Sequence, residues 1–138
     1  MSKYDKTMMA VAFLWAEHAT CDRLSVGCVI SRDERILVQG YNGAPKGMPH
    51  CPPLHEPERC LAVHAEQNTI AWAARTGISL LNSTAYSTHQ PCLICARLLI
   101  TAGITRVVYS EPYRLIDGLE LLEVAGIDTY RFEWESNS

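Results

Sequence analysis

Four residues of this chain have the types and spacing of a metal-dependent catalytic site. They form an H-x-E pattern, His64 and Glu66, and a P-C-x-x-C pattern that ends with Cys92 and Cys95. One imidazole and two thiolates offer three ligands to a tetrahedral Zn²⁺ and leave its fourth position open for water, as in catalytic rather than structural zinc sites. The spacing therefore predicts that the histidine and both cysteines bind zinc, with the glutamate beside the metal.

The chemistry that fits these residues is hydrolytic deamination of a ring. Zinc lowers the pKa of a bound water to about 7, which supplies a nucleophile at neutral pH. Glu66 would accept the proton of that water and pass it to the ring and to the leaving ammonia, acting first as general base and then as general acid. H-x-E together with P-C-x-x-C is the signature of zinc-dependent nucleobase deaminases. Alone, a C-x-x-C pair also fits a redox pair, a structural zinc site or two buried thiols.

Two predicted helices begin at these motifs. Residues 63–75 have helical spacing and are followed by Gly77, whereas residues 92–102 follow Pro91 and are followed by Gly103. Proline near the first turn and glycine after the last one are typical helix boundaries. A helix N-terminus carries partial positive charge, which favours thiolate over thiol. We therefore expect two helix N-termini to meet at the metal.

The remaining elements predict an α/β fold. We expect one further helix near the N-terminus and one near the C-terminus, a hairpin with its turn at 32–34, a long loop at 41–62 and three later strands. A strand–helix alternation after an opening hairpin favours a three-layer α/β/α sandwich around a mixed five-stranded sheet. The expected helices span 5–19 and 117–125, and the expected strands span 26–31, 35–40, 83–87, 105–110 and 127–132.

Composition excludes several classes of protein. The chain has 138 residues and a net charge of −3, without a basic run. Binding to duplex nucleic acid depends on Lys and Arg, so we expect no nucleic-acid partner. Residues 8–15 are apolar but are followed by Glu17 and His18, which indicates an amphipathic helix rather than a signal peptide or a membrane span. We expect a single cytoplasmic domain over residues 1–138 that does not bind a membrane.

Beyond the zinc motif, the chain resembles the deoxycytidylate (dCMP) deaminases of the cytidine-deaminase-like superfamily. The resemblance covers roughly residues 20–130. The zinc motif alone indicates the superfamily, whereas a Gly-Tyr-Asn-Gly-x-Pro loop and a Val-Tyr-x₃-Tyr ending indicate the dCMP deaminases within it. It implies conversion of dCMP to dUMP and ammonia for thymidylate synthesis, and a homohexamer activated by dCTP and inhibited by dTTP, with Mg²⁺ accompanying the triphosphate. The matching segments are 26–30 (VGCVI), 40–45 (GYNGAP), 64–68 (HAEQN), 88–96 (THQPCLICA) and 102–109 (AGITRVVY).

The resemblance also implies a set of substrate contacts. Asn42 matches a residue that contacts the substrate sugar, although Asn before Gly is also a strong turn signal. Tyr109 and Tyr113 match an aromatic pair near the pyrimidine, although Tyr109 also fits a core position at a strand end. The 5′-phosphate contacts would come from Asn68 and Arg114, and a solvated arginine is the alternative for the latter. Ala65 and Thr88, inside the matching motifs, complete the candidate set.

The other cysteines raise the question of a second metal. Cys28 lies in an apolar strand and fits a buried small side chain. Some members of the family hold a structural zinc with cysteines at places like Cys21 and Cys51, and a metal would help to order the long loop. Cys60 and either His55 or His50 would complete that site. Free thiols in a loop are the alternative, since disulfides are rare in the cytosol.

The resemblance places a regulatory triphosphate near the 40–43 loop. Arg23, Gly40, Tyr41 and Gly43, together with Asn42, are the candidate contacts. A loop that touches both substrate and effector would couple the two sites directly.

Trp72 and Arg75, one turn apart on the expected zinc helix, match positions that couple regulation to subunit contact. The alternative is that Trp72 packs in the core and Arg75 lies on a solvated face.

Two other functions fit the zinc motif. One is a deaminase that acts on a base in tRNA or DNA, which the net charge of −3 disfavours. The other is a catalytically inactive zinc module used for assembly, which the presence of Glu66 disfavours. Ammonia release from dCMP, cytidine and an oligonucleotide would separate these possibilities.

Overall fold

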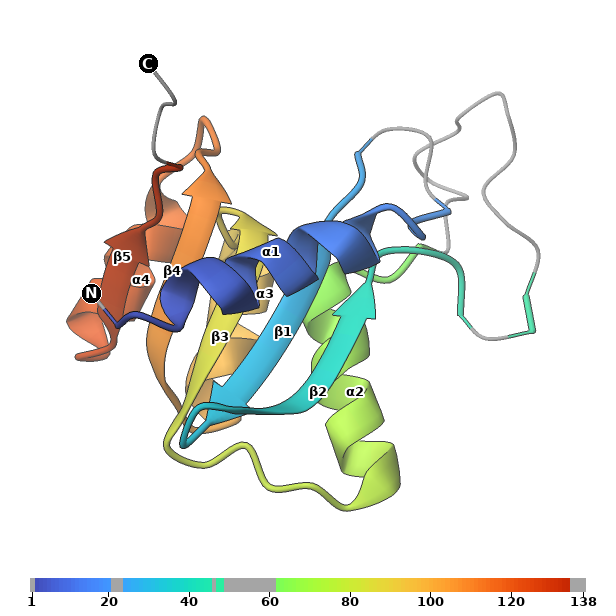
Figure 1. Cartoon of the computed structure of the whole chain (residues 1–138). Helices are drawn as coiled ribbons and strands as arrows, with labels where there is room; N and C mark the ends of the chain where they lie inside the picture. The colour runs from blue at the N-terminus through green and yellow to red at the C-terminus, as the bar shows by residue number, and fades with distance from the viewer. Residues whose placement is uncertain (1, 21–23, 46, 49–61, 135–138) are drawn as a thin grey trace.

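The described residues of this computed structural model, 2–20, 24–45, 47–48 and 62–134, form a mixed sheet covered by helices (Figure 1). The predicted five strands and four helices are all present. In chain order they are α1 (Asp5–Ala16), β1 (Gly27–Arg32), β2 (Arg35–Tyr41), α2 (Ala65–Thr76), β3 (Ser83–His89), α3 (Leu93–Thr101), β4 (Ile104–Glu111), α4 (Asp117–Val124) and β5 (Asp128–Arg131).

The strands pair in the order β2-β1-β3-β4-β5. β1 is antiparallel to both β2 and β3, whereas β3, β4 and β5 are parallel to one another. Parallel neighbours need a crossover connection, and α3 and α4 supply the two crossovers. The mixed sheet and its three-layer arrangement confirm the predicted fold class.

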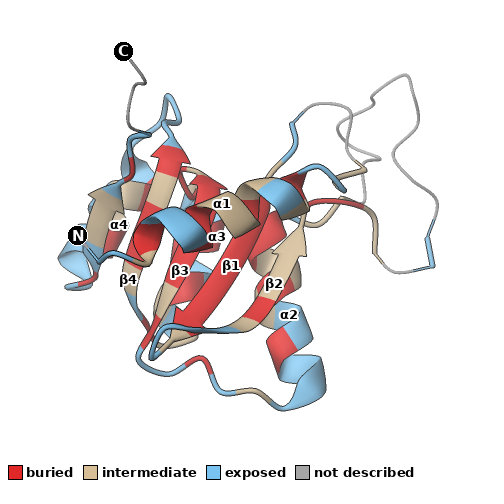
Figure 2. Cartoon of the chain, viewed as in Figure 1, coloured by how far each residue is buried: buried red, intermediate tan, exposed pale blue. Residues whose placement is uncertain are grey.

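Each face of the sheet has its own hydrophobic core, because successive side chains of a strand point to opposite faces. α1 covers one face, where Met9 and Ala12 pack against Val29, Tyr86 and Val108. The helices α2, α3 and α4 cover the other face (Figure 1). The central strands are accordingly the most buried part of the chain (Figure 2). The second core contains Cys28, Ile30, Ala65, Ala85, Ala96, Leu99, Val107 and Leu122.

The hairpin turn lies where the sequence predicts it. Asp33 and Glu34 have φ values of 53° and 65°, in the left-handed region. Two left-handed residues form the type I′ turn, whose twist matches that of the flanking strands. The sequence offers no Asn-Gly or Asp-Gly signal here, so the turn is set by the pairing of β1 with β2.

Three element ends differ from the sequence predictions by two or three residues, and the other ends by at most one. α1 ends at Ala16 because the next residues form i→i−3 bonds, such as Glu17 N–H to Leu14 C=O at 3.2 Å. α2 begins at Ala65 because Val63 instead exchanges backbone hydrogen bonds with Gly43, at 2.7 and 3.1 Å. β3 continues through His89 because it follows β4 to Glu111.

One buried ion pair connects α1 to the sheet. The carboxylate of Asp5 accepts two hydrogen bonds from Arg106 on β4, both at 2.8 Å, and one from the Tyr86 hydroxyl on β3 at 2.7 Å. Asp5 is fully buried. The bidentate geometry satisfies a charge that would otherwise be costly to bury. Among the described helices, none is long and apolar enough to cross a membrane.

Candidate active site

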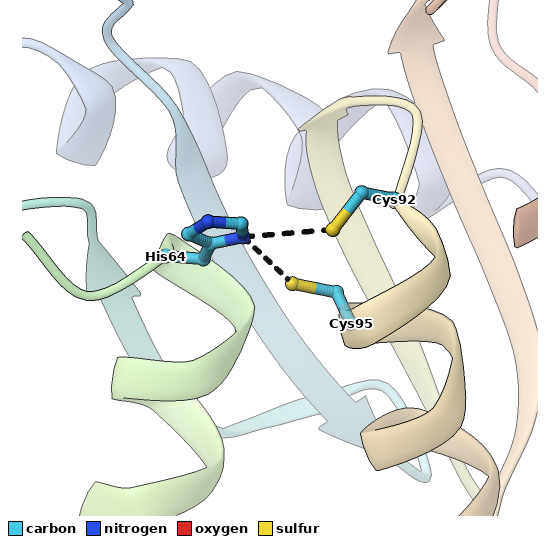
Figure 3. A group of neighbouring side chains, drawn as sticks. All are labelled: His64, Cys92 and Cys95. Carbon is cyan, nitrogen blue, oxygen red and sulfur yellow. Dashed lines mark hydrogen bonds between the residues drawn. The ribbon is translucent and has the colours of Figure 1, made fainter. Parts of the chain in front are cut away.

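His64, Cys92 and Cys95 meet between the N-termini of α2 and α3 (Figure 3). His64 Nδ1 lies 3.2 Å from Cys95 Sγ and 3.6 Å from Cys92 Sγ. All three potential ligand atoms lie within 4.8 Å of one another. The structure thus brings together the three residues that the sequence predicts as zinc ligands.

These separations fit a tetrahedral zinc ion. Zn–N and Zn–S bonds of the usual lengths place nitrogen and sulfur ligands about 3.5 Å apart. The two N···S distances lie on either side of that value. A structural Cys₂His₂ site would need a fourth protein ligand, and the metal-ligand group found among the described residues has three. The donor set therefore fits a zinc ion with one open coordination position.

Both ligand turns are helix caps. His64 is the N-cap of α2, and its backbone N–H donates to the Gln67 side chain at 2.8 Å. Cys92 is the N-cap of α3, and its carbonyl accepts from Ala96 N–H at 2.8 Å. Cys95 follows in the first turn of α3 and is fully buried. The expected convergence of two helix N-termini is confirmed, and it favours negative charge on the ligands.

Hydrogen bonds among the three side chains shift their pKa values in opposite directions. Hydrogen bonds from Cys95 and then His64 lower the pKa of Cys92 to about 3. The hydrogen bond to Cys92, with burial, raises the pKa of Cys95, and the hydrogen bond to Cys92 raises the pKa of His64. Zinc binding displaces such protons, because metal ligands must be deprotonated.

Glu66 lies in the first turn of α2 and is buried, at 5% exposure. Burial raises the pKa of its carboxyl group. A buried carboxyl group with a raised pKa next to a metal site is the usual arrangement for a general acid–base residue. Ala65, at the same helix end, is 1% exposed, and its main-chain N–H is among the first of the helix, which have no carbonyl partner inside it.

A row of residues across the sheet lies under these helix ends. In the pairing of the strands, Gly40, Cys28, Ser87 and Tyr109 are consecutive neighbours. Gly40 is in close contact with α2, since a Cβ there would lie 2.7 Å from Thr69 Oγ1. Tyr109, which is half-buried, thus shares the sheet face that carries the zinc ligands. The placement is compatible with its predicted contact with the pyrimidine.

The sequence predicted no functional role for two residues of this row, Cys28 and Ser87. Cys28 is fully buried in the core, as expected, and burial raises its pKa so that it stays a neutral thiol. Ser87 is 1% exposed, and its hydroxyl has no hydrogen-bond partner among the described residues. Its type gave no signal in the sequence, because serine in a strand usually marks a solvated position.

Asn42 has a structural role in addition to its predicted one. Its side-chain oxygen accepts from Val26 N–H at 2.8 Å, and its amide donates to Leu24 C=O at 2.6 Å. Its φ is not positive, so the alternative interpretation as a left-handed turn residue is wrong. The side chain fixes the end of β2 against the chain that enters β1. Contact with the sugar stays a prediction.

The other predicted substrate residues lie at different depths. Thr88 is fully buried, backbone included, and its hydroxyl accepts from Gly27 N–H at 3.1 Å, so its predicted contact with the substrate stays a prediction. Asn68 donates to Tyr41 C=O at 2.8 Å. Tyr113 is 42% exposed, and Arg114 beside it is also exposed, so both side chains are accessible to a ligand.

Most of the predicted effector residues line one cavity of about 400 Å³. Its wall includes Gly40, Tyr41, Gly43 and Trp72, and also Asn68 from the predicted substrate set. His64 and Glu66 are not in that wall, so the cavity is separate from the zinc-ligand group.

Trp72 is 42% exposed, which rules out core packing as its role. Arg75 is exposed, as the solvated-face alternative expects, and its guanidinium lies 5.1 Å from the centre of the Trp72 ring in a cation–π contact.

Some predicted residues fall outside the described part of the chain. Arg23 belongs to the predicted effector set. The others are the candidates for a second zinc: Cys21, His50, Cys51, His55 and Cys60.

One residue near the site had no predicted role. Gln90 lies between β3 and Cys92 and is buried, at 6% exposure. Its side chain donates to Leu115 C=O at 2.8 Å and accepts from Tyr113 N–H at 3.0 Å. A glutamine before proline carries no signal of its own, so only the three-dimensional contact identifies it.

Comparison with known proteins gives a family match and similar relatives. The model of the cytidine and deoxycytidylate deaminase zinc-binding region matches residues 2–111. ComE operon protein 2 of Bacillus subtilis (strain 168) is 37% identical over 139 residues, which cover 94% of this chain and 71% of that protein. The deoxycytidylate deaminase of Mycobacterium phage D29 is 35% identical over 123 residues, which cover 78% of this chain and 94% of that protein.

A solved dCMP deaminase structure is similar to this chain in fold. The dCMP deaminase from the cyanophage S-TIM5, solved in complex with dCMP and dUMP, has a TM-score of 0.87 and 29% sequence identity. The match covers 96% of this chain and 99% of that chain.

Proposed function

The chain belongs to the cytidine and deoxycytidylate deaminase family, and we propose that it hydrolyses dCMP to dUMP and ammonia. It is a zinc-dependent hydrolase of nucleotide metabolism. The observation that carries this function is the meeting of His64, Cys92 and Cys95 beside the buried Glu66. The dUMP product is the precursor that thymidylate synthesis requires.

His64, Cys92 and Cys95 hold the zinc ion, which supplies an activated water for hydrolysis at neutral pH. The buried carboxylate of Glu66 accepts a proton from the attacking water. It then delivers this proton to N3 of the cytosine ring, takes the second proton from the hydroxyl group now bonded to C4 and passes it to the amino nitrogen. The C4–N bond breaks, ammonia leaves and the C4 carbonyl of dUMP forms. Burial raises the pKa of Glu66, which makes its carboxylate a stronger base for the first of these transfers.

The other site residues bind and orient the nucleotide. The N–H of Ala65, at the start of α2, donates to a carbonyl of the pyrimidine, while Tyr109 and Tyr113 flank the ring. Asn42 contacts the sugar. Arg114 and Asn68 contact the 5′-phosphate, and the guanidinium supplies a charge-assisted hydrogen bond. The exposure of Tyr113 and Arg114 supports these roles.

The experiment that tests this function compares substrates on the wild-type enzyme. We expect ammonia release from dCMP and far less from deoxycytidine, which lacks the phosphate. We expect none from a cytosine-containing oligonucleotide, because the chain carries a net charge of −3. Preference for the oligonucleotide would instead indicate a nucleic-acid deaminase, and no release from any substrate by the zinc-loaded protein would indicate an inactive zinc module.

We further propose that the cavity between β2 and α2 binds the regulatory triphosphate. Its wall contains Gly40, Tyr41, Gly43 and Trp72, and a volume of about 400 Å³ lies in the range of small-molecule sites. dCTP would activate and dTTP would inhibit, with Mg²⁺ accompanying the phosphates and Arg23 contributing charge.

The proposed assembly is a cytoplasmic homohexamer. Large apolar side chains are exposed on the outer helices, for example Ile94 at 53% on α3 and Val124 at 85% on α4. Exposed apolar surface favours contact with another chain, so these helices support self-association.

A second, structural zinc is also proposed. Its ligands would be Cys21, Cys51 and Cys60 with His55 or His50, all outside the described residues. Metal analysis of the purified enzyme should find two zinc ions per chain, and Cys51→Ser should reduce the number to one. A fully active wild type with one zinc per chain would contradict the second site.

A further inference from the structure

The segment between β4 and α4, residues 112–116, combines exposed side chains with a firmly held backbone. Tyr113, Leu115 and Ile116 are 42%, 50% and 58% exposed. The segment has no regular secondary structure. Its two ends are nevertheless in direct contact with the turn that carries the zinc ligand Cys92.

Gln90 contacts the last residue of β4, just before the segment, and two residues within the segment. Its backbone N–H donates to Glu111 C=O at 2.8 Å. Its side-chain amide donates to Leu115 C=O at 2.8 Å, and its side-chain oxygen accepts from Tyr113 N–H at 3.0 Å. A side-chain amide donates through its nitrogen and accepts through its oxygen. The two hydrogen bonds therefore fix the orientation of the Gln90 amide.

Gly118 makes the contact at the far end of the segment. A Cβ at this position would lie 2.5 Å from the Pro91 carbonyl oxygen and 3.0 Å from the Cys92 carbonyl carbon. The backbone of α4 therefore packs directly on the backbone of the zinc-ligand turn. The hydrogen bonds of the buried Gln90 and the close backbone packing at Gly118 together fix the segment relative to Cys92.

We propose that Gln90 is a positioning residue that sets the preference of the enzyme for the nucleotide over the nucleoside. This inference rests on the proposed function, in which Arg114 contacts the 5′-phosphate. Arg114 lies between Tyr113 and Leu115, the two residues whose backbone Gln90 binds. An arginine on a fixed backbone loses less conformational freedom when it binds a phosphate, so holding the segment strengthens that contact.

Two variants of similar shape test the inference. Gln90→Met removes both side-chain hydrogen bonds, whereas Gln90→Glu keeps the acceptor for Tyr113 N–H but cannot donate to Leu115 C=O. We expect Gln90→Met to lower kcat/KM for dCMP about tenfold, mainly through KM, with a smaller change on deoxycytidine. Gln90→Glu should lie between Gln90→Met and the wild type. The inhibition constants of dUMP and deoxyuridine give the same comparison of nucleotide with nucleoside. They do not require that the enzyme turn over the nucleoside.

Two further variants separate positioning from general damage. Leu115→Ala shortens an exposed side chain of the same segment but keeps the carbonyl that Gln90 binds, so the preference for dCMP should be unchanged. In an Arg114→Gln background, Gln90→Met should cause little further loss of preference, because the two residues act through one contact. Zinc content and Tm are measured for every variant.

The outcomes distinguish this inference from the proposed function. A wild-type enzyme that does not deaminate dCMP would contradict the function before any variant is made. If the wild type prefers dCMP but both Gln90 variants lower kcat/KM equally on dCMP and deoxycytidine, the positioning role is wrong. An undiminished effect of Gln90→Met in the Arg114→Gln background would also overturn it.

Discussion

The side chains of the site lie close together but differ in exposure: His64 is exposed and Cys92 half-buried, whereas Cys95 and Glu66 are buried. The hydrogen bonds from Cys95 and His64 lower the pKa of Cys92, whereas the hydrogen bond to Cys92 raises the pKa of Cys95. Glu66 is buried and its pKa is raised by that burial. Glu66 is thus placed beside the group formed by His64, Cys92 and Cys95 rather than within it, as the proposed proton transfer requires.

Glu66→Gln is expected to keep the fold and the zinc but lose turnover. The amide has the same shape and is not a metal ligand, yet it cannot accept a proton from water. A positioned acid–base group contributes about 10²–10⁴-fold to the rate, so kcat should fall by at least about 10²-fold. Zinc content by metal analysis and kcat on dCMP check this prediction. Activity near the wild-type level would exclude Glu66 as the proton shuttle.

Ser87→Ala is expected to leave stability unchanged or to raise it by about 1 kcal/mol, because a buried hydroxyl without a partner costs free energy. Ser83, on the same strand and also 1% exposed, is the matched control, since its hydroxyl donates to Leu80 C=O. Ser83→Ala should lower the free energy of unfolding by about 1 kcal/mol. Denaturant unfolding measures both. A clear loss of stability in Ser87→Ala would mean that its hydroxyl has a partner after all.

At the scale of elements, the sequence predicted the order and type of every helix and strand but missed what joins them. Hydrophobic alternation and the glycines after the helices are local signals, so element ends differ by only a few residues. The zinc ligands were predictable because metal chemistry restricts residue type and spacing. Gln90, Ser87 and the Asp5–Arg106 pair were not, because each depends on partners distant in the chain.

The contact between α1 and the sheet should depend on the charge of Asp5. Asp5→Asn leaves the Arg106 guanidinium, only 21% exposed, without its anion and should cost about 3 kcal/mol of unfolding free energy. Asp128→Asn is the matched control, because Asp128 lies 3.7 Å from the same guanidinium but is 75% exposed. Its effect should stay below about 1 kcal/mol. Equal effects of the two substitutions would contradict the importance of the buried pair.

The same pair predicts a loss of stability in acid. Burial favours the protonated form of Asp5, but hydrogen bonds from Arg106 and Tyr86 outweigh it and hold the pKa of Asp5 below its usual value. A lowered pKa in the folded state contributes stability above the unfolded-state pKa of about 3.9, and this contribution is lost as the pH falls through the folded-state pKa. The wild type should therefore lose more stability than Asp5→Asn when Tm is measured from pH 6 down to pH 3.

At the scale of the whole molecule, the cavity and the catalytic site share one helix. α2 begins with His64 as its cap and with Glu66 in its first turn, and further along it carries Asn68 and Trp72, which line the cavity. Thr69 on this helix is in close contact with Gly40 on β2, so the cavity wall is continuous with the base of the site. A ligand that moves β2 against α2 would therefore change the position of the acid–base residue, which is a physical basis for coupling between two sites.

Regulation is expected to act through that cavity in an assembled enzyme. dCTP should lower and dTTP should raise the apparent KM for dCMP, and light scattering should give the mass of a hexamer. Trp72→Ala removes one of the two aromatic side chains in the cavity wall and should weaken the response to both triphosphates about tenfold, since stacking on a base contributes about 1–3 kcal/mol. Leu81→Ala, at a site that is 60% exposed and not part of the cavity wall, is the control and should respond as the wild type does. A monomer whose KM for dCMP does not change with either triphosphate would refute the regulatory proposal. A hexamer in which Trp72→Ala still responds fully would show that the effector binds at another site.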